Sequence, residues 1–221
     1  MYPPTIKTGG EISHSINSLF LINDFNLSAS LQGNVSARLE QTSLNNHWQI
    51  LPRASLTYKM KDFYLSAIAG LYQQLPENSF LLRNQHLSAE RCWQYILGAY
   101  HEANGKTFRL EVYNKKYHNL ATNLNNNYTS DGYGYARGID LFLNDREVVK
   151  NLEYMLAYSY NDSKRKYGDY PAEAMPQYAT RHNLSLALKY WVQPIRSTIG
   201  ITDRFASGRI ADFRVCAEVA N

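Results

Sequence analysis

The sequence alternates between apolar and polar residues over most of its length, and this period of two restricts the fold more than any other feature. The stretch Asn151–Asp162, "NLEYMLAYSYND", is a clear case. One set of positions holds Leu152, Tyr154, Leu156, Tyr158 and Tyr160, and the other holds Glu153, Met155, Ala157, Ser159 and Asn161. Because successive side chains of an extended chain point to opposite sides, the pattern predicts a β-strand with two different faces. The apolar face must contact either a protein core or lipid.

The same alternation recurs along the chain, and no segment shows a convincing helical period. We expect strands at 11–22, 27–42, 49–60, 63–75, 86–102, 107–120, 132–144, 151–163, 180–192 and 195–206. The sequence therefore predicts an all-β fold, an antiparallel up-and-down meander of about ten long strands.

The connections between these strands are expected to alternate in length. Short turns are predicted at 23–26, 61–62, 103–106, 145–150 and 193–194. Long polar loops are predicted at 43–48, 76–85, 121–131 and 164–179. Short turns on one side and long loops on the other are typical of a transmembrane outer-membrane β-barrel.

Strand length, aromatic residues and charge all favour lipid outside and water inside. The predicted strands are about twice as long as the mode of about 5 to 6 residues in globular proteins. Aromatic residues near strand ends suit the interfaces of a membrane: Tyr58, Tyr72, Trp93, Tyr117, Tyr160, Tyr190 and Trp191. Charged residues on the polar faces suit a wet lumen: Arg38, Glu40, Arg109, Glu111, Asp140, Glu153 and Lys189. A soluble all-β domain with one solvated sheet face remains the alternative.

Composition excludes several classes of protein. With 44% hydrophobic and 19% charged residues, the chain has no uninterrupted apolar run of about 18 residues, which a membrane helix requires. The net charge of +4 is spread along the chain, so no nucleic-acid partner is indicated. Cys92 and Cys216 are far apart and lack metal-ligand spacing, so neither a disulfide framework nor a zinc site is expected.

No motif points to catalysis, a cofactor or a metal. The chain continues as a strand and not as a helix after Gly132, Gly134 and Gly138, so strand glycines explain them better than a phosphate-binding loop does. The histidines show no ligand spacing: His14, His47, His86, His101, His118 and His182. A nucleophile elbow of the form GxSxG is absent from the sequence, so we assign no catalytic residue and expect a protein that is not an enzyme.

Two polar segments are candidates for ligand contact, but neither assigns a site. The run 125–135, "NNNYTSDGYGY", is rich in residues that hydrogen-bond or stack on a glycan or chelate, although a solvated external loop explains it better. Lys164, Arg165 and Lys166 could attract anionic ligands or lipopolysaccharide phosphates, and a solvated basic loop explains them equally well. Ligand-binding residues therefore stay unknown.

Several stretches, taken in order, resemble the barrel of TonB-dependent outer-membrane receptors of Gram-negative bacteria. They are "LPRASLTYKMKDFYLSAIAGLYQQLPE" (51–77), "LSAERCWQYILGAYHEANGKTFRLEVYNKKYHNL" (87–120), "GYGYARGIDLFL" (132–143), "LEYMLAYSYNDSK" (152–164) and "TRHNLSLALKYW" (180–191). The resemblance implies import of an iron chelate, a cobalamin or a glycan through a barrel of about twenty-two strands. It also implies an amino-terminal plug domain, the TonB system and outer-membrane lipid as partners.

The chain departs from this pattern in length. About ten strands are expected, without a plug, a TonB-contacting segment or a signal peptide, and the terminal aromatic residue of such barrels is replaced by Asn221. We therefore expect a partial barrel over 1–206, an irregular tail over 207–221, and a truncated piece that cannot transport alone.

Two alternatives stay open. A self-closing outer-membrane barrel, acting as a porin or an enzyme, would pair the first strand with the tenth. A soluble β-rich binding domain would pack the faces of Leu152 and Leu184 against each other in two layers.

Overall fold

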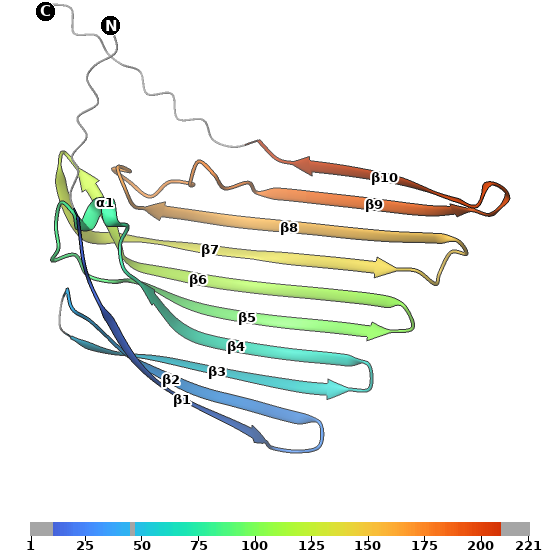
Figure 1. Ribbon diagram of the computed structural model, residues 1–221, viewed down its shortest axis with the longest axis horizontal. Coiled ribbons are helices and arrows are strands. Elements are labelled where there is room, and N and C mark those ends of the chain that lie inside the picture. Colours follow the sequence, from blue (N-terminus) through green and yellow to red (C-terminus); the bar gives the residue numbers. More distant parts are fainter. Residues whose placement is uncertain (1–10, 45–46, 209–221) are drawn as a thin grey trace, which may run out of the picture.

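A computed structural model describes residues 11–44 and 47–208. Ten strands form one antiparallel sheet in which each strand pairs with its neighbours in sequence, as Figure 1 shows. The strands are β1 (Ile16–Asn26), β2 (Leu31–Thr42), β3 (Trp48–Met60), β4 (Phe63–Gln74), β5 (Glu90–Ala103), β6 (Lys106–Leu124), β7 (Asn127–Asp145), β8 (Leu152–Lys166), β9 (His182–Val192) and β10 (Ser197–Ala206). The predicted all-β meander is confirmed. A short helix α1 (Asn78–Leu81) and a 3₁₀ turn (Gln193–Ile195) complete the described elements.

The strand register brings most of the apolar strand residues onto one face, here called the outer face. Leu143 of β7 pairs with Leu156 of β8, which in turn pairs with Leu186 of β9. The same face carries Leu19, Leu39, Leu56, Leu65, Leu97, Leu110 and Ile201 on the remaining strands. Many of these side chains are exposed; Leu97 and Ile201, for example, are each 63% exposed. No second layer of the described chain covers them, so the two-layer packing of a soluble sandwich is not met.

The opposite face, here called the inner face, is mainly polar. On this face, side chains of strands that are not neighbours in the sheet contact each other. Tyr113 of β6 donates a hydrogen bond across β7 to the Oδ1 atom of Asn161 on β8, at 3.3 Å. Arg165 of β8 likewise reaches the hydroxyl of Tyr117 on β6, at 3.0 Å. Side chains of non-adjacent strands converge on the concave side of a curved sheet, so the inner face is the concave one.

Gly138 of β7 makes the first of these crossings possible. A Cβ atom at this position would lie 2.6 Å from the Tyr113 hydroxyl and 2.1 Å from the backbone oxygen of Tyr160. The glycine therefore lets the Tyr113 ring pack over the backbone and lets β7 and β8 approach closely. This is the strand role that the sequence favoured over a phosphate-binding loop.

The predicted long loop at 121–131 is wrong. Strands β6 and β7 continue to the pair Leu124–Asn127, and a two-residue turn of Asn125 and Asn126 joins them, with φ of 54° and 60°. Positive φ at both central residues is the requirement of the hairpin turn that matches strand twist, and asparagine tolerates it. The polar run therefore extends the sheet beyond its neighbours instead of leaving it.

The predicted short turn at 23–26 is also wrong. Strand β1 runs on to Asn26, and the turn is at 27–30, so Leu27 and Ala29 are not part of the outer face of a strand. The reason lies in Gly33 of β2, which pairs with Phe25. A Cβ atom at Gly33 would be 2.4 Å from the Phe25 ring, so the missing side chain lets the aromatic residue stay in the sheet.

The two longest connections, 75–89 and 167–181, lie at the same end of the sheet, at the left in Figure 1. Helix α1 lies in the first of them, where a helix was not expected. A small hydrophobic core of Leu81, Leu87 and Ala121 fixes this connection against β6. No helix of the described residues is long and apolar enough to cross a membrane.

A break divides the sheet at this loop end. The pairing of β3 with β4 stops at Arg53–Gly70, although both strands continue. Beyond that point, side-chain hydrogen bonds join the strand tips among the residues that the structure describes. Gln73 donates to the Oε1 atom of Glu40 at 2.9 Å, and Arg91 donates to the Oε1 atom of Gln49 at 2.5 Å. The edge strands β1 and β10 pair only with β2 and β9 among the described residues.

Candidate functional site

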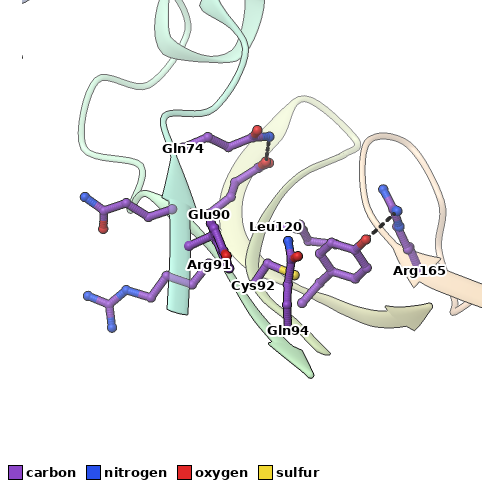
Figure 2. A pocket seen from close by; sticks show the side chains of 10 residues that line it. Gln74, Glu90, Arg91, Cys92, Gln94, Leu120 and Arg165 are labelled. Atoms are coloured by element: carbon purple, nitrogen blue, oxygen red, sulfur yellow. Dashed lines mark hydrogen bonds between the residues drawn. The ribbon is translucent and has the colours of Figure 1, made fainter. Parts of the chain in front are cut away.

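A cavity of about 260 Å³ opens on the inner face near the loop end of β4, β5, β6 and β8. Its lining is mostly polar and consists of Tyr72, Gln73, Gln74, Glu90, Arg91, Cys92, Gln94, Tyr117, Leu120 and Arg165. Figure 2 shows Arg165 on one side of this cavity and the Gln74–Glu90 pair on the other. The two sides differ in the hydrogen-bonding groups that they offer.

Arg165 supplies the positive charge of one wall. Its Nη2 atom donates to the Tyr117 hydroxyl and its Nη1 atom to the Tyr178 hydroxyl, both at 3.0 Å. The guanidinium carbon also lies 4.1 Å from the centroid of the Tyr117 ring, a cation–π contact. Its Nε atom is buried and has no hydrogen-bond partner among the described residues. Nη1 and Nη2 each carry a second N–H beyond these two bonds, and these donors of a fixed guanidinium group can bind an anion.

On the other wall, the Glu90 carboxylate is already hydrogen-bonded within the protein. Glu90 accepts a hydrogen bond from Gln74 at 2.9 Å and another from the backbone N–H of Ala121 at 3.0 Å. These bonds satisfy both carboxylate oxygens, so Glu90 holds β4, β5 and β6 together. The Oε1 atom of Gln73 is buried and has no partner among the described residues. Because this oxygen is buried, it is not an exposed acceptor of the cavity wall.

The connection 167–181 holds Arg165 in place. It folds back on β8, where the backbone N–H of Arg165 donates to Ala174 at 2.8 Å. Gly168 donates in the same way to Ala121 of β6, also at 2.8 Å. Burial, together with the phenol groups of Tyr178 and Tyr170, raises the pKa of Tyr167 far above its usual range. Tyr167 is therefore a neutral donor at any physiological pH.

The three consecutive basic residues take different positions. Arg165 lies on the inner face and lines the cavity. Lys164 is exposed on the outer face, and Lys166 forms an ion pair with the carboxylate of Asp131 at 2.7 Å. The Lys166 ammonium and the hydroxyls of Thr122 and Thr129 hold the pKa of this carboxyl well below its usual range. Only one of the three therefore belongs to the candidate site.

The other candidate residues lie outside the cavity. The glycines Gly132, Gly134 and Gly138 are all within β7, with strand on both sides. The run 125–135 forms the β6–β7 turn and the first part of β7 and does not line the cavity.

Two of the histidines, His101 and His182, contact aromatic side chains of the sheet. His101 stacks on Phe63 with ring centroids 4.4 Å apart, and His182 hydrogen-bonds to the Tyr158 hydroxyl at 2.9 Å. Among the described residues, no group of three or more histidine, cysteine or acidic side chains could hold a metal ion. Cys92 is a free thiol in the cavity wall, and Cys216 lies outside the described residues.

A meander with an apolar outer face and a polar inner face defines the wall of a transmembrane β-barrel. A family model described as "TonB dependent receptor-like, beta-barrel" matches residues 2–214. The chain therefore belongs to the TonB-dependent receptor barrel family, as its sequence indicates, and is an outer-membrane protein. This is a family of receptors and not of enzymes.

Solved structures of such receptors share the fold. The siderophore receptor PiuA from Acinetobacter baumannii is 15% identical, with a TM-score of 0.71, over 87% of this chain and 33% of that protein. The ferric citrate transporter FecA is 13% identical, with a TM-score of 0.71, over 90% and 33%. The alcaligin receptor FauA from Bordetella pertussis is 17% identical, with a TM-score of 0.64, over 88% and 37%. The chain thus spans about a third of these proteins. A comparison with curated protein sequences finds no match.

Proposed function

We propose that this chain is part of a receptor that imports a small iron chelate across the outer membrane with energy from the TonB system. The family supports the transport role, and the structural neighbours include a siderophore receptor and a ferric citrate transporter. The observation that carries the choice of ligand class is the cavity beside Arg165. A fixed guanidinium group with a free donor suits the carboxylate, catecholate or hydroxamate oxygens of an anionic chelate.

We further propose that the ten strands work within a larger closed barrel, with a plug domain as a partner. In hydrocarbon, each unpaired backbone group of an open edge costs several kcal/mol. The free edges of β1 and β10 therefore require partner strands from outside residues 16–206. We also propose that residues 1–206 form barrel wall and that residues 207–221 form a tail. Residues 209–221 lie outside the described part of the chain.

Uptake of radioactive iron tests the transport role. The whole protein that contains this chain is produced in iron-starved cells that lack other receptors, and ferric citrate and ferric alcaligin are supplied in turn. We expect accumulation of one chelate above the level of cells without the protein. Because import is energised, an uncoupler of the proton gradient should abolish it. Accumulation that is insensitive to the uncoupler would contradict the proposal and favour a passive pore.

The substitution Arg165→Gln should weaken binding of the imported chelate by about tenfold, the effect of losing one charge-assisted hydrogen bond. Ligand titration of the purified protein by tryptophan fluorescence would measure this. Arg204→Gln is the matched control, because Arg204 also lies on the inner face, opposite Ser185, but does not line the cavity. Equal losses for both variants would show that general lumen charge, and not the cavity, attracts the ligand.

A further inference from the structure

The outer face contains a groove whose walls are almost entirely apolar. Small residues of β3 and β4, Ala54, Ala67 and Ala69, form its floor. Larger side chains border it on both sides: Phe25 and Val35 from β1 and β2, and Tyr95, Leu97 and Val112 from β5 and β6. The groove has a volume of about 580 Å³. Its position on the lipid-facing side makes a hydrocarbon chain the occupant that fits its chemistry.

Cationic side chains follow where the apolar part of this face ends. On β6, β7 and β8 the last apolar row is Val112, Ile139 and Tyr160. In the next row, Arg137 forms an ion pair with Asp162 at 2.8 Å, so the two charges cancel. The row therefore attracts no further counter-ion.

The next row toward the long connections holds two lysines without counter-ions. Register places Lys116 of β6, Tyr135 of β7 and Lys164 of β8 side by side on the outer face. Both lysines are exposed, and neither makes an ion pair with a described residue. Two strand spacings separate them, about 10 Å. One further row up, Lys166 is again neutralised, by Asp131.

The groove and the lysine pair are adjacent. Asn114 lines the upper end of the groove and precedes Lys116 by two residues on the same face of β6, about 7 Å along the strand. An apolar channel that leads up to a pair of free ammonium groups matches a molecule with an acyl chain below and a phosphate above. The long connections 75–89 and 167–181 place this end of the sheet on the external side.

We propose that Lys116 and Lys164 bind the phosphate of a phosphorylated glycolipid of the outer leaflet, and that one of its acyl chains lies in the groove. The lysines supply charge, since each basic residue near a membrane surface strengthens binding of anionic lipid by about fivefold. The proposal rests on the outer-membrane location and is independent of the imported ligand.

Native mass spectrometry of the whole protein in detergent tests this site, with lipid A as the probe. The double variant Lys116→Gln/Lys164→Gln should bind lipid A about 25-fold more weakly. Lys115→Gln is the matched control, because Lys115 is the neighbouring residue on the inner face, against the Tyr113 ring, and binding should not change. Heat-modifiable gel mobility shows that each variant is folded.

Two further measurements separate the parts of the site. Dephosphorylated lipid A should bind the unchanged protein as weakly as lipid A binds the double variant, and inorganic phosphate alone should bind little. Ala69→Phe, which fills the groove floor, should weaken lipid A binding even though both lysines remain. Unchanged binding by the double variant, or equal binding of dephosphorylated lipid, would overturn the phosphate site. Unchanged binding by Ala69→Phe would overturn the acyl-chain groove.

Discussion

Replacing Gly138 with alanine is expected to lower the free energy of unfolding by about 3 kcal/mol, the upper end of the usual cost of overpacking. The added Cβ atom would lie 2.1 Å from the backbone oxygen of Tyr160 on the paired strand. A backbone oxygen within a strand ladder cannot rotate away, so β7 and β8 must separate locally. Urea titration of the purified protein in detergent, followed by tryptophan fluorescence, would measure the change.

Gly200→Ala is the control for this experiment. Gly200 is also within a strand, β10, but a Cβ atom there would meet only the backbone oxygen of Leu188, at 3.8 Å, which is ordinary van der Waals contact. We expect its unfolding curve to match that of the unchanged protein. If both alanine variants unfold alike, the close approach of β7 and β8 at Gly138 is not a requirement of the fold.

Replacing Leu156 with arginine is expected to cost about 2–4 kcal/mol in a bilayer. Leu156 lies on the outer face between Leu143 and Leu186, so the charge would enter the centre of the lipid-facing band. Refolding into phospholipid vesicles, followed by urea titration, would show the loss as a lower denaturation midpoint.

Met155→Arg separates the effect of lipid from that of size. Met155 is adjacent in β8, similar in volume and 41% exposed, but it lies on the inner face opposite Asn144. A charge there meets water, so we expect little loss of stability. The opposite ranking of the two variants would mean that the apolar face does not contact lipid.

The sequence predicted the strands because alternation is a local property of the chain. The residues around Leu152 and Leu184 alternate cleanly, and their strands, β8 and β9, lie close to the expected ranges. Turn positions were harder, because they depend on pairs of residues on different strands. The Asn125–Asn126 turn consists of residues equally common in long loops, and the extension of β1 to Phe25 depends on Gly33 of the next strand.

The candidate site could be predicted only in part. Arg165 belonged to a basic run that sequence reasoning selected, but the alternation of β8 did not by itself show which of the three residues lines a cavity. Tyr117 was expected as an aromatic residue of the membrane interface, but it lies on the inner face and lines the cavity, and no sequence feature marked Gln94. Only the register of β5 to β8 and the return of the chain at Ala174 bring these side chains together.

The break between β3 and β4 is the place where the sheet deforms most easily. From Arg53–Gly70 to Met60–Phe63, a continuous backbone ladder joins the two strands. Beyond that pair, hydrogen bonds of the Gln73 and Arg91 side chains join the two parts, and each contributes about 1.5–3 kcal/mol because one partner is charged. Under lateral strain, the tips of β1–β3 therefore shift against those of β4–β8 before any ladder opens, and the shape of the rim beside the cavity changes with them.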